Sequence, residues 1–103
     1  MIHVIATIDV NAGRRDDFLA EFRHLVPQVR AEAGCIQYGP SVDVDSGISA
    51  QKAVRDNAVV VVEQWESLEA LQTHLVAPHM QEYRTKVKDL VAGMDLQILQ
   101  SID

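Results

Sequence analysis

The side chains best suited to chemistry gather in one stretch of the chain, residues 58–83. Glu63 and Trp65 end a run of four valines that predicts a buried strand. His74 lies on the helix predicted to follow, and His79 comes directly after the proline that interrupts this helix. Because an unperturbed imidazole titrates near neutral pH, a histidine beside an apolar strand can act as a general base. The stretch therefore predicts a proton-transfer site between strand and helix, with both histidines as candidate bases.

Aromatic and acidic side chains complete the candidate site. Trp65 and Tyr38 can form a stacking wall for an aromatic ligand, and Tyr83 on the predicted helix is a further candidate for substrate binding. Glu63 is a candidate acid or base at the end of the strand. These candidates also have structural interpretations. Trp65 can be a core anchor, Glu63 the partner of a histidine or arginine, and Tyr38 a brace for the predicted bulge. His74 can instead be a hydrogen-bonded brace between helix and sheet.

The two histidines are not equivalent. His74 borders the apolar stripe of its helix and can reach the core, whereas His79 begins a new turn and is expected to be wetter. We therefore expect His74 to matter more to a reaction. Metal ligands on one helical face are three or four residues apart, and these two are five apart across a proline, so no metal is expected. Cys35 has no base at a motif spacing and is interpreted as a small apolar residue.

The composition restricts the classes of partner. The chain has 103 residues, a net charge of −6 and no basic stripe, which argues against nucleic acid and anionic membranes. No glycine-rich phosphate loop is present, so a nucleotide cofactor is not expected. The N-terminal residues are too short and too polar for a signal peptide, and there is a single cysteine. We expect one domain, residues 1–103, in the cytoplasm.

Hydrophobic periodicity predicts an alternation of strands and helices. Gly34 is expected to end the first helix and Gly93 the second, while Gly39 and Pro40 predict a bulge or an edge in the second strand. Residues 45–57 are predicted to form a turn and a long, partly extended connection. The predicted elements are strands at 2–10, 35–44, 58–65 and 94–101, and helices at 14–33 and 68–92 with an interruption at Pro78.

The predicted order is βαββαβ, the ferredoxin-like arrangement of the α+β class, with an antiparallel sheet and both helices on one face. The valine run is apolar on both of its faces, and Ile5 lies on the second face if Val4 faces the helices. Two helices cannot cover both sides of a sheet, and a large bare apolar face is not tolerated on a soluble monomer. We therefore expect a homodimer packed sheet to sheet, or a larger assembly built from it.

Two groups of residues resemble a known family over nearly the whole chain. The first is Glu32-Ala33-Gly34-Cys35 followed by Tyr38. The second is Glu63-Gln64-Trp65 followed by Ala70-Leu71, His74-Leu75 and Pro78-His79-Met80. In these residues the chain resembles the antibiotic biosynthesis monooxygenase (ABM) domain family, and more closely its quinol monooxygenase-like members. The resemblance implies a dimeric α+β barrel.

The resemblance implies several activities, because the family includes monooxygenases without metal or flavin, haem-degrading enzymes and isomerases. The positions that carry haem degradation fall here on Ala6, His74 and Arg84, none of which matches, so that activity is not implied. The expected function is a cofactor-independent monooxygenase acting on a quinol or polycyclic phenol, with catalytic His74, His79 and Glu63. An isomerase using the same histidines and a binding dimer without turnover stay open as alternatives.

Overall fold

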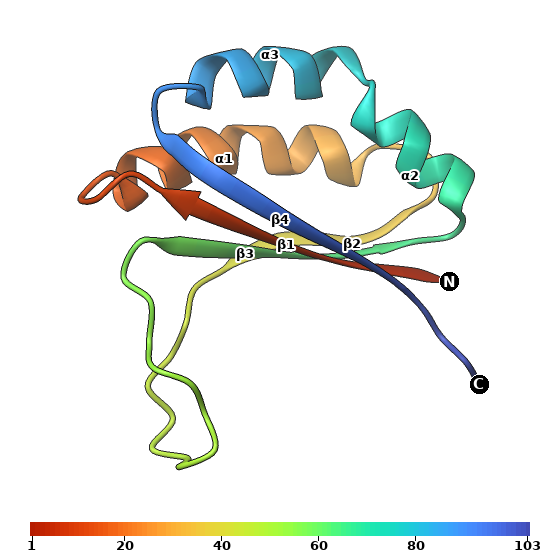
Figure 1. Cartoon of the computed structure of the whole chain (residues 1–103). Coiled ribbons are helices and arrows are strands. Elements are labelled where there is room, and N and C mark those ends of the chain that lie inside the picture. Colours follow the sequence, from red (N-terminus) through yellow and green to blue (C-terminus); the bar gives the residue numbers. More distant parts are fainter.

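Four strands and three helices make up the chain in the order β1, α1, β2, β3, α2, α3, β4 (Figure 1). The structure is a computed structural model that describes residues 1–103. No helix is long and apolar enough to cross a membrane. The bounds are β1 Ile2–Val10, α1 Arg15–Arg30, β2 Cys35–Ser41, β3 Ala58–Trp65, α2 Leu68–Leu75, α3 Pro78–Val87 and β4 Val91–Gln100.

All strand pairs are antiparallel, and the sheet order is β2-β3-β1-β4. The three helices lie on one side of the sheet, and the other side carries no helix (Figure 1). This confirms the predicted α+β class and ferredoxin-like arrangement. Strands β1 and β3 occupy the centre and have the bounds that their apolar patterns predicted.

The second half of the chain differs from the prediction in its boundaries. One interrupted helix proves to be two, because Ala77 is extended and Pro78 opens α3 at a position where a missing backbone N–H is tolerated. Helix α3 ends at Val87, and Gly93 lies inside β4 opposite Asp9 instead of closing a helix. The strand begins at Val91, three residues before the predicted start, because its backbone continues the ladder with β1.

The first helix and the second strand are shorter than predicted. Helix α1 ends at Arg30 and is capped by Ala31, so Gly34 is not its cap but a later residue of the turn. Strand β2 ends at Ser41 rather than Val44. It is an edge strand, which accommodates Pro40, and its register shift lies between Cys35 and Gln37 rather than at Gly39 and Pro40.

The residues between β2 and β3 form an arm, residues 42–57, which extends from the side of the sheet opposite the helices (Figure 1). Within the arm, the Asp43 carboxylate accepts from Arg55 Nε at 2.8 Å, from Nη2 at 2.9 Å and from its backbone N–H at 2.9 Å. These bonds hold the pKa of Asp43 at about 2. Gln51 donates to the Val44 carbonyl at 2.8 Å, so the arm is bound together by polar contacts.

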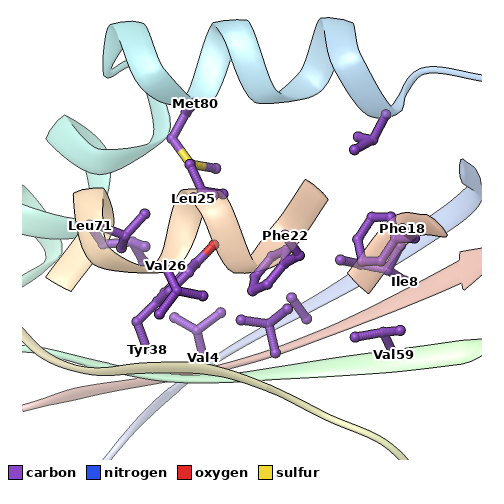
Figure 2. Packing of buried hydrophobic residues seen from close by; sticks show 14 of the residues in the cluster. Val4, Ile8, Phe18, Phe22, Leu25, Val26, Tyr38, Val59, Leu71 and Met80 are labelled. Carbon is purple, nitrogen blue, oxygen red and sulfur yellow. The ribbon is translucent and has the colours of Figure 1, made fainter. Parts of the chain in front are cut away.

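The core lies between the sheet and the helices (Figure 2). Val59 and Val61 of the valine run are buried on the helix side, whereas Val60 and Val62 are half-buried on the open side. Strand β1 alternates in the same way, as a half-covered antiparallel strand should. The largest fully buried side chains include Trp65, Phe18, Phe22 and His74.

Gly34 sets the distance between the turn after α1 and helix α2. Its φ is +83°, and a Cβ there would lie 2.6 Å from the Cβ of Ala70. The Gly34 carbonyl also accepts from the Glu66 N–H at 2.9 Å. A side chain at this position would push the turn away from α2.

We expect Gly34→Ala to destabilise the fold by about 3 kcal/mol, the sum of a left-handed backbone and an overlap with helix α2. Gly13→Ala is the matched control, because Gly13 has φ +78° but nothing within 4 Å of its Cβ position. The control should lose only about 1 kcal/mol. Urea unfolding monitored by circular dichroism measures both, and equal losses would refute the close-contact argument.

Candidate active site

An apolar cavity of about 370 Å³ lies between the helix side of the sheet and helices α1, α2 and α3. Twelve of its 16 lining residues are hydrophobic, which suits an aromatic or other apolar ligand. Met94 and Leu96 of β4 line it and are 58% and 41% exposed, because the helices leave this edge strand uncovered. The cavity therefore opens to solvent beside β4.

Three buried residues bring polar atoms to this cavity: Tyr38 from β2, Glu63 from β3 and His74 from α2. Every side-chain nitrogen or oxygen that is fully shielded from solvent has a hydrogen-bond partner. The Tyr38 hydroxyl, Glu63 Oε2 and His74 Nε2 have no partner within the chain, so each keeps some accessible surface, and all three residues line the cavity. An apolar ligand would thus meet a hydroxyl, a carboxyl oxygen and an imidazole nitrogen.

Glu32, from the turn between α1 and β2, joins the two candidate histidines. Its Oε2 lies 3.0 Å from His74 Nδ1 and 2.7 Å from His79 Nε2. A carboxylate only accepts hydrogen bonds, so this geometry favours the tautomer of His74 with its proton on Nδ1 and its lone pair on Nε2. The Glu32 side chain is 13% exposed, His74 2% and His79 22%, so the bonds run from the cavity wall toward the surface.

Trp65 lies behind this wall. It is fully buried, its indole N–H donates to Glu63 Oε1 at 2.9 Å, and its ring centroid is 4.6 Å from that of His74. It therefore holds one oxygen of Glu63 and one face of His74, which leaves the remaining polar atom of each toward the cavity. Trp65 itself does not line the cavity.

The aromatic side chains form one connected group along the cavity. Tyr38 stacks on Phe22 at 5.6 Å between ring centroids, and Tyr83 meets Phe22 edge to face at 5.7 Å. Tyr38 also meets His74 edge to face at 5.5 Å. Figure 2 shows the Tyr38 ring rising from the sheet into the space below the helices. These contacts fix the aromatic rings in position.

Burial shifts the ionisation of four cavity residues, Tyr38, Glu63, His74 and Tyr83, toward their neutral forms. Desolvation raises the pKa of Glu63 to about 7, against the lowering effect of the Trp65 hydrogen bond, and the nearby Glu32 raises it further. Desolvation lowers the pKa of His74 despite its bond to Glu32. It raises the pKa of both Tyr38 and Tyr83. At neutral pH the cavity thus holds a neutral imidazole, neutral phenols and a carboxyl group near half-ionisation.

The structure brings together four of the six predicted site residues. Tyr38, Glu63, His74 and Tyr83 line the cavity, whereas His79 and Trp65 support it from behind. The structure contains no group of three or more His, Cys, Asp or Glu side chains arranged to hold a metal ion. Cys35 is half-buried, and desolvation raises its thiol pKa.

Glu32 was not predicted as a site residue. It lies 42 positions before His74, and no local pattern links the two. The available signal was a carboxylate placed just before a glycine turn, in one of the two groups that carry the family resemblance. Arg84 and Lys88 also line the cavity and were not predicted.

Fold and site together define an α+β domain with an apolar cavity and an imidazole–carboxyl pair. The family model described as "Antibiotic biosynthesis monooxygenase" matches residues 1–86, and the chain belongs to this family. A protein of Escherichia coli (strain K12) named "Probable quinol monooxygenase YgiN" is 42% identical over 102 residues, covering 97% of each chain.

Solved structures show the same fold. PA3566 from Pseudomonas aeruginosa has a TM-score of 0.81 at 26% identity, with coverage of 99% of this chain and 94% of that one. Rv0793 from Mycobacterium tuberculosis has a TM-score of 0.80 at 25% identity, with coverage of 99% and 95%.

The raised pKa of Glu63 predicts a pH-dependent stability. The unfolded glutamate has its ordinary pKa of 4.5 and the folded one a pKa of about 7, so between these values only the folded chain keeps the proton. The stabilising contribution of the neutral group is fully present below pH 4.5 and is lost as the pH rises through 7. At about 1.4 kcal/mol per pKa unit, the wild type should lose about 3 kcal/mol relative to Glu63→Gln across this range.

Urea unfolding of both proteins at a series of pH values measures this difference. The lowered pKa of His74 acts with the opposite sign, since an unfolded imidazole binds a proton more readily, but His74 is present in both proteins and its effect cancels. A difference that does not change with pH would show that Glu63 titrates normally in the folded protein.

Proposed function

We propose that the protein is a cofactor-independent monooxygenase that acts on a quinol or polycyclic phenol. The observation that carries the proposal is that His74, whose Nε2 has no partner within the chain, lines an apolar cavity of about 370 Å³ together with Tyr38 and Tyr83. The name of the 42% identical E. coli protein supports the same substrate class.

His74 is the proposed general base. Its neutral imidazole can take the proton of a substrate hydroxyl on Nε2, while Nδ1–H stays bonded to Glu32. The carboxylate then stabilises the imidazolium that forms. The resulting phenolate is electron-rich enough to reduce dioxygen. A quinol and one dioxygen give a hydroxyquinone and one water, so the quinol itself supplies the electrons that reduce the second oxygen atom.

Glu63 and the tyrosines have complementary roles. With a pKa of about 7, Glu63 can donate from Oε2 to a second substrate oxygen when protonated and accept when ionised. The Tyr38 hydroxyl stays protonated and can donate to an anion in the cavity. Tyr83 and the apolar lining exclude water from the reduced oxygen species.

Oxygen consumption with a panel of hydroquinones tests the function, in buffer containing EDTA and no added flavin. We expect turnover by the wild type, and a kcat lowered about a hundredfold in His74→Ala, because general-base assistance contributes that much. His24→Ala, which alters an exposed histidine, is the control and should keep the wild-type rate. Equal rates for wild type and a folded His74→Ala would eliminate the proposed base. Isomerisation of a substrate without oxygen uptake would favour the isomerase instead.

We also propose that the protein forms a homodimer through the open side of the sheet. No helix covers this side, where Ile5, Val60 and Val62 are half-buried, and the arm extends from it (Figure 1). The arm presents Val44 and Ile48 at 72% and 67% exposure. A second copy supplies both an apolar surface for the arm and a cover for the sheet.

Sedimentation at micromolar concentration should give at least twice the 11.4 kDa chain mass. The double change Val44→Asp and Ile48→Asp should raise the dimer dissociation constant by at least about a hundredfold, since it buries charge in the proposed interface. Val76→Asp is the matched control, because Val76 is 67% exposed on the helix layer and should have no effect. A wild-type monomer would exclude the dimer, and a dimer insensitive to the arm changes would exclude the arm from its interface.

A further inference from the structure

The three residues Glu32, His74 and His79 come from three separate elements and meet at one oxygen atom. Oε2 of Glu32 lies within 3.0 Å of His74 Nδ1 and within 2.7 Å of His79 Nε2, and Oε1 lies 3.2 Å from the same Nδ1. The carboxylate is thus bonded to one nearly buried imidazole and to one that is partly exposed. Neither catalysis by Glu32 nor contact with a substrate is needed to explain this geometry, because Glu32 does not line the cavity.

We propose that Glu32 is a positioning residue for His74: anchored by His79, it fixes the imidazole in the tautomer with its proton on Nδ1 and its lone pair on Nε2 toward the cavity. A neutral imidazole in water exchanges between both tautomers, and only one of them leaves Nε2 free to accept a proton. The inference rests on the proposed function, in which Nε2 is the base.

His79 has a defined part in this arrangement. Its bond to Oε2 is the shortest of the three, and it enters from α3, whose first turn packs beside the end of α2. It bonds to the same oxygen as His74, so the carboxylate cannot turn out to solvent without breaking this bond. His79 therefore acts on the base through Glu32, which accounts for its distance from the cavity.

Other interactions around His74 cannot substitute for Glu32. Trp65 and Tyr38 contact the ring of His74 through their aromatic rings, which hold the plane of the imidazole but do not distinguish its two nitrogens. The Trp65 N–H is already donated to Glu63. Within the chain, only Glu32 has a hydrogen bond to a ring nitrogen of His74.

The test is to measure the tautomer directly. Nitrogen-15 NMR of the full-length protein with labelled histidine distinguishes protonated from unprotonated ring nitrogens. In the wild type at pH 8 we expect His74 with its proton on Nδ1. In Glu32→Gln the amide can present either its oxygen or its NH₂ group, so we expect a mixture of tautomers or the Nε2–H form.

A positioning role predicts a change in kcat with little change in KM. Glu32→Gln should lower kcat about tenfold to a hundredfold with KM changed less than about twofold, because the substrate does not contact Glu32. His79→Gln should show a smaller fall in kcat and a partial change of tautomer. Glu66→Gln is the matched control, an exposed glutamate close to the same turn, and should match the wild type in both measurements.

The outcomes separate the two proposals. If Glu32→Gln and Glu32→Ala both fold and His74 keeps its proton on Nδ1 in both, the positioning role is wrong whatever the kinetics show. If the tautomer changes as expected but the wild type oxidises no quinol, the positioning role stands and the proposed function fails. If Glu32→Gln unfolds, the NMR spectrum of His79→Gln decides, because loss of this anchor must alter the His74 tautomer if the proposal is correct.

Discussion

The site depends on a carboxylate that is shared between two imidazoles. Glu32 connects the turn after α1 to both α2 and α3 through its bonds to His74 and His79. Because the carboxylate is largely removed from water, its charge requires these donors, and loss of either histidine leaves it partly unsatisfied. The close contact between Gly34 and Ala70 brings the turn near enough to α2 for the bond to form. The Gly34–Ala70 contact and the Glu32–His74 hydrogen bond therefore both hold the turn after α1 against α2.

A second constraint comes from the valine run of β3, which places apolar side chains on both faces of the sheet. Alternate valines of β3 enter the core under the helices or lie on the side without helices. On the helix side the apolar residues are buried, but a cavity remains beside β4, where Met94 and Leu96 are exposed. The same strand thus fills the core, delivers Glu63 to the cavity, and places two half-buried valines, Val60 and Val62, on the side without helices.

The sequence predicted much of the fold because its strongest signals were local. The alternation in residues 2–10 and the valine run gave β1 and β3 with their bounds, and Pro78 marked the break between α2 and α3. The errors arose where a local signal competed with tertiary pairing. Gly93 resembled a helix end, but the ladder with β1 extends through it.

In the candidate site, too, the residues set by local patterns could be predicted and those set by tertiary contacts could not. Glu63, His74 and the two tyrosines could be predicted because a strand end and a helix stripe place them on one side of the sheet. Glu32 could not, since its contact with His74 joins positions 42 residues apart through a turn whose conformation depends on Gly34. Amphipathic periodicity also could not show that Trp65 lies behind the cavity wall, because a buried aromatic fits either position.

The position of Trp65 has one more consequence. It is the only tryptophan in the chain, and it touches both titrating groups of the cavity: its N–H is bonded to Glu63 and its ring lies 4.6 Å from that of His74. The emission of an indole responds to the electric field and to proton transfer from groups in contact with it. A change in the ionisation of Glu63 or His74 should therefore change the fluorescence of Trp65, although Trp65 does not line the cavity. The intrinsic fluorescence of Trp65 can therefore be used to follow the cavity without a label.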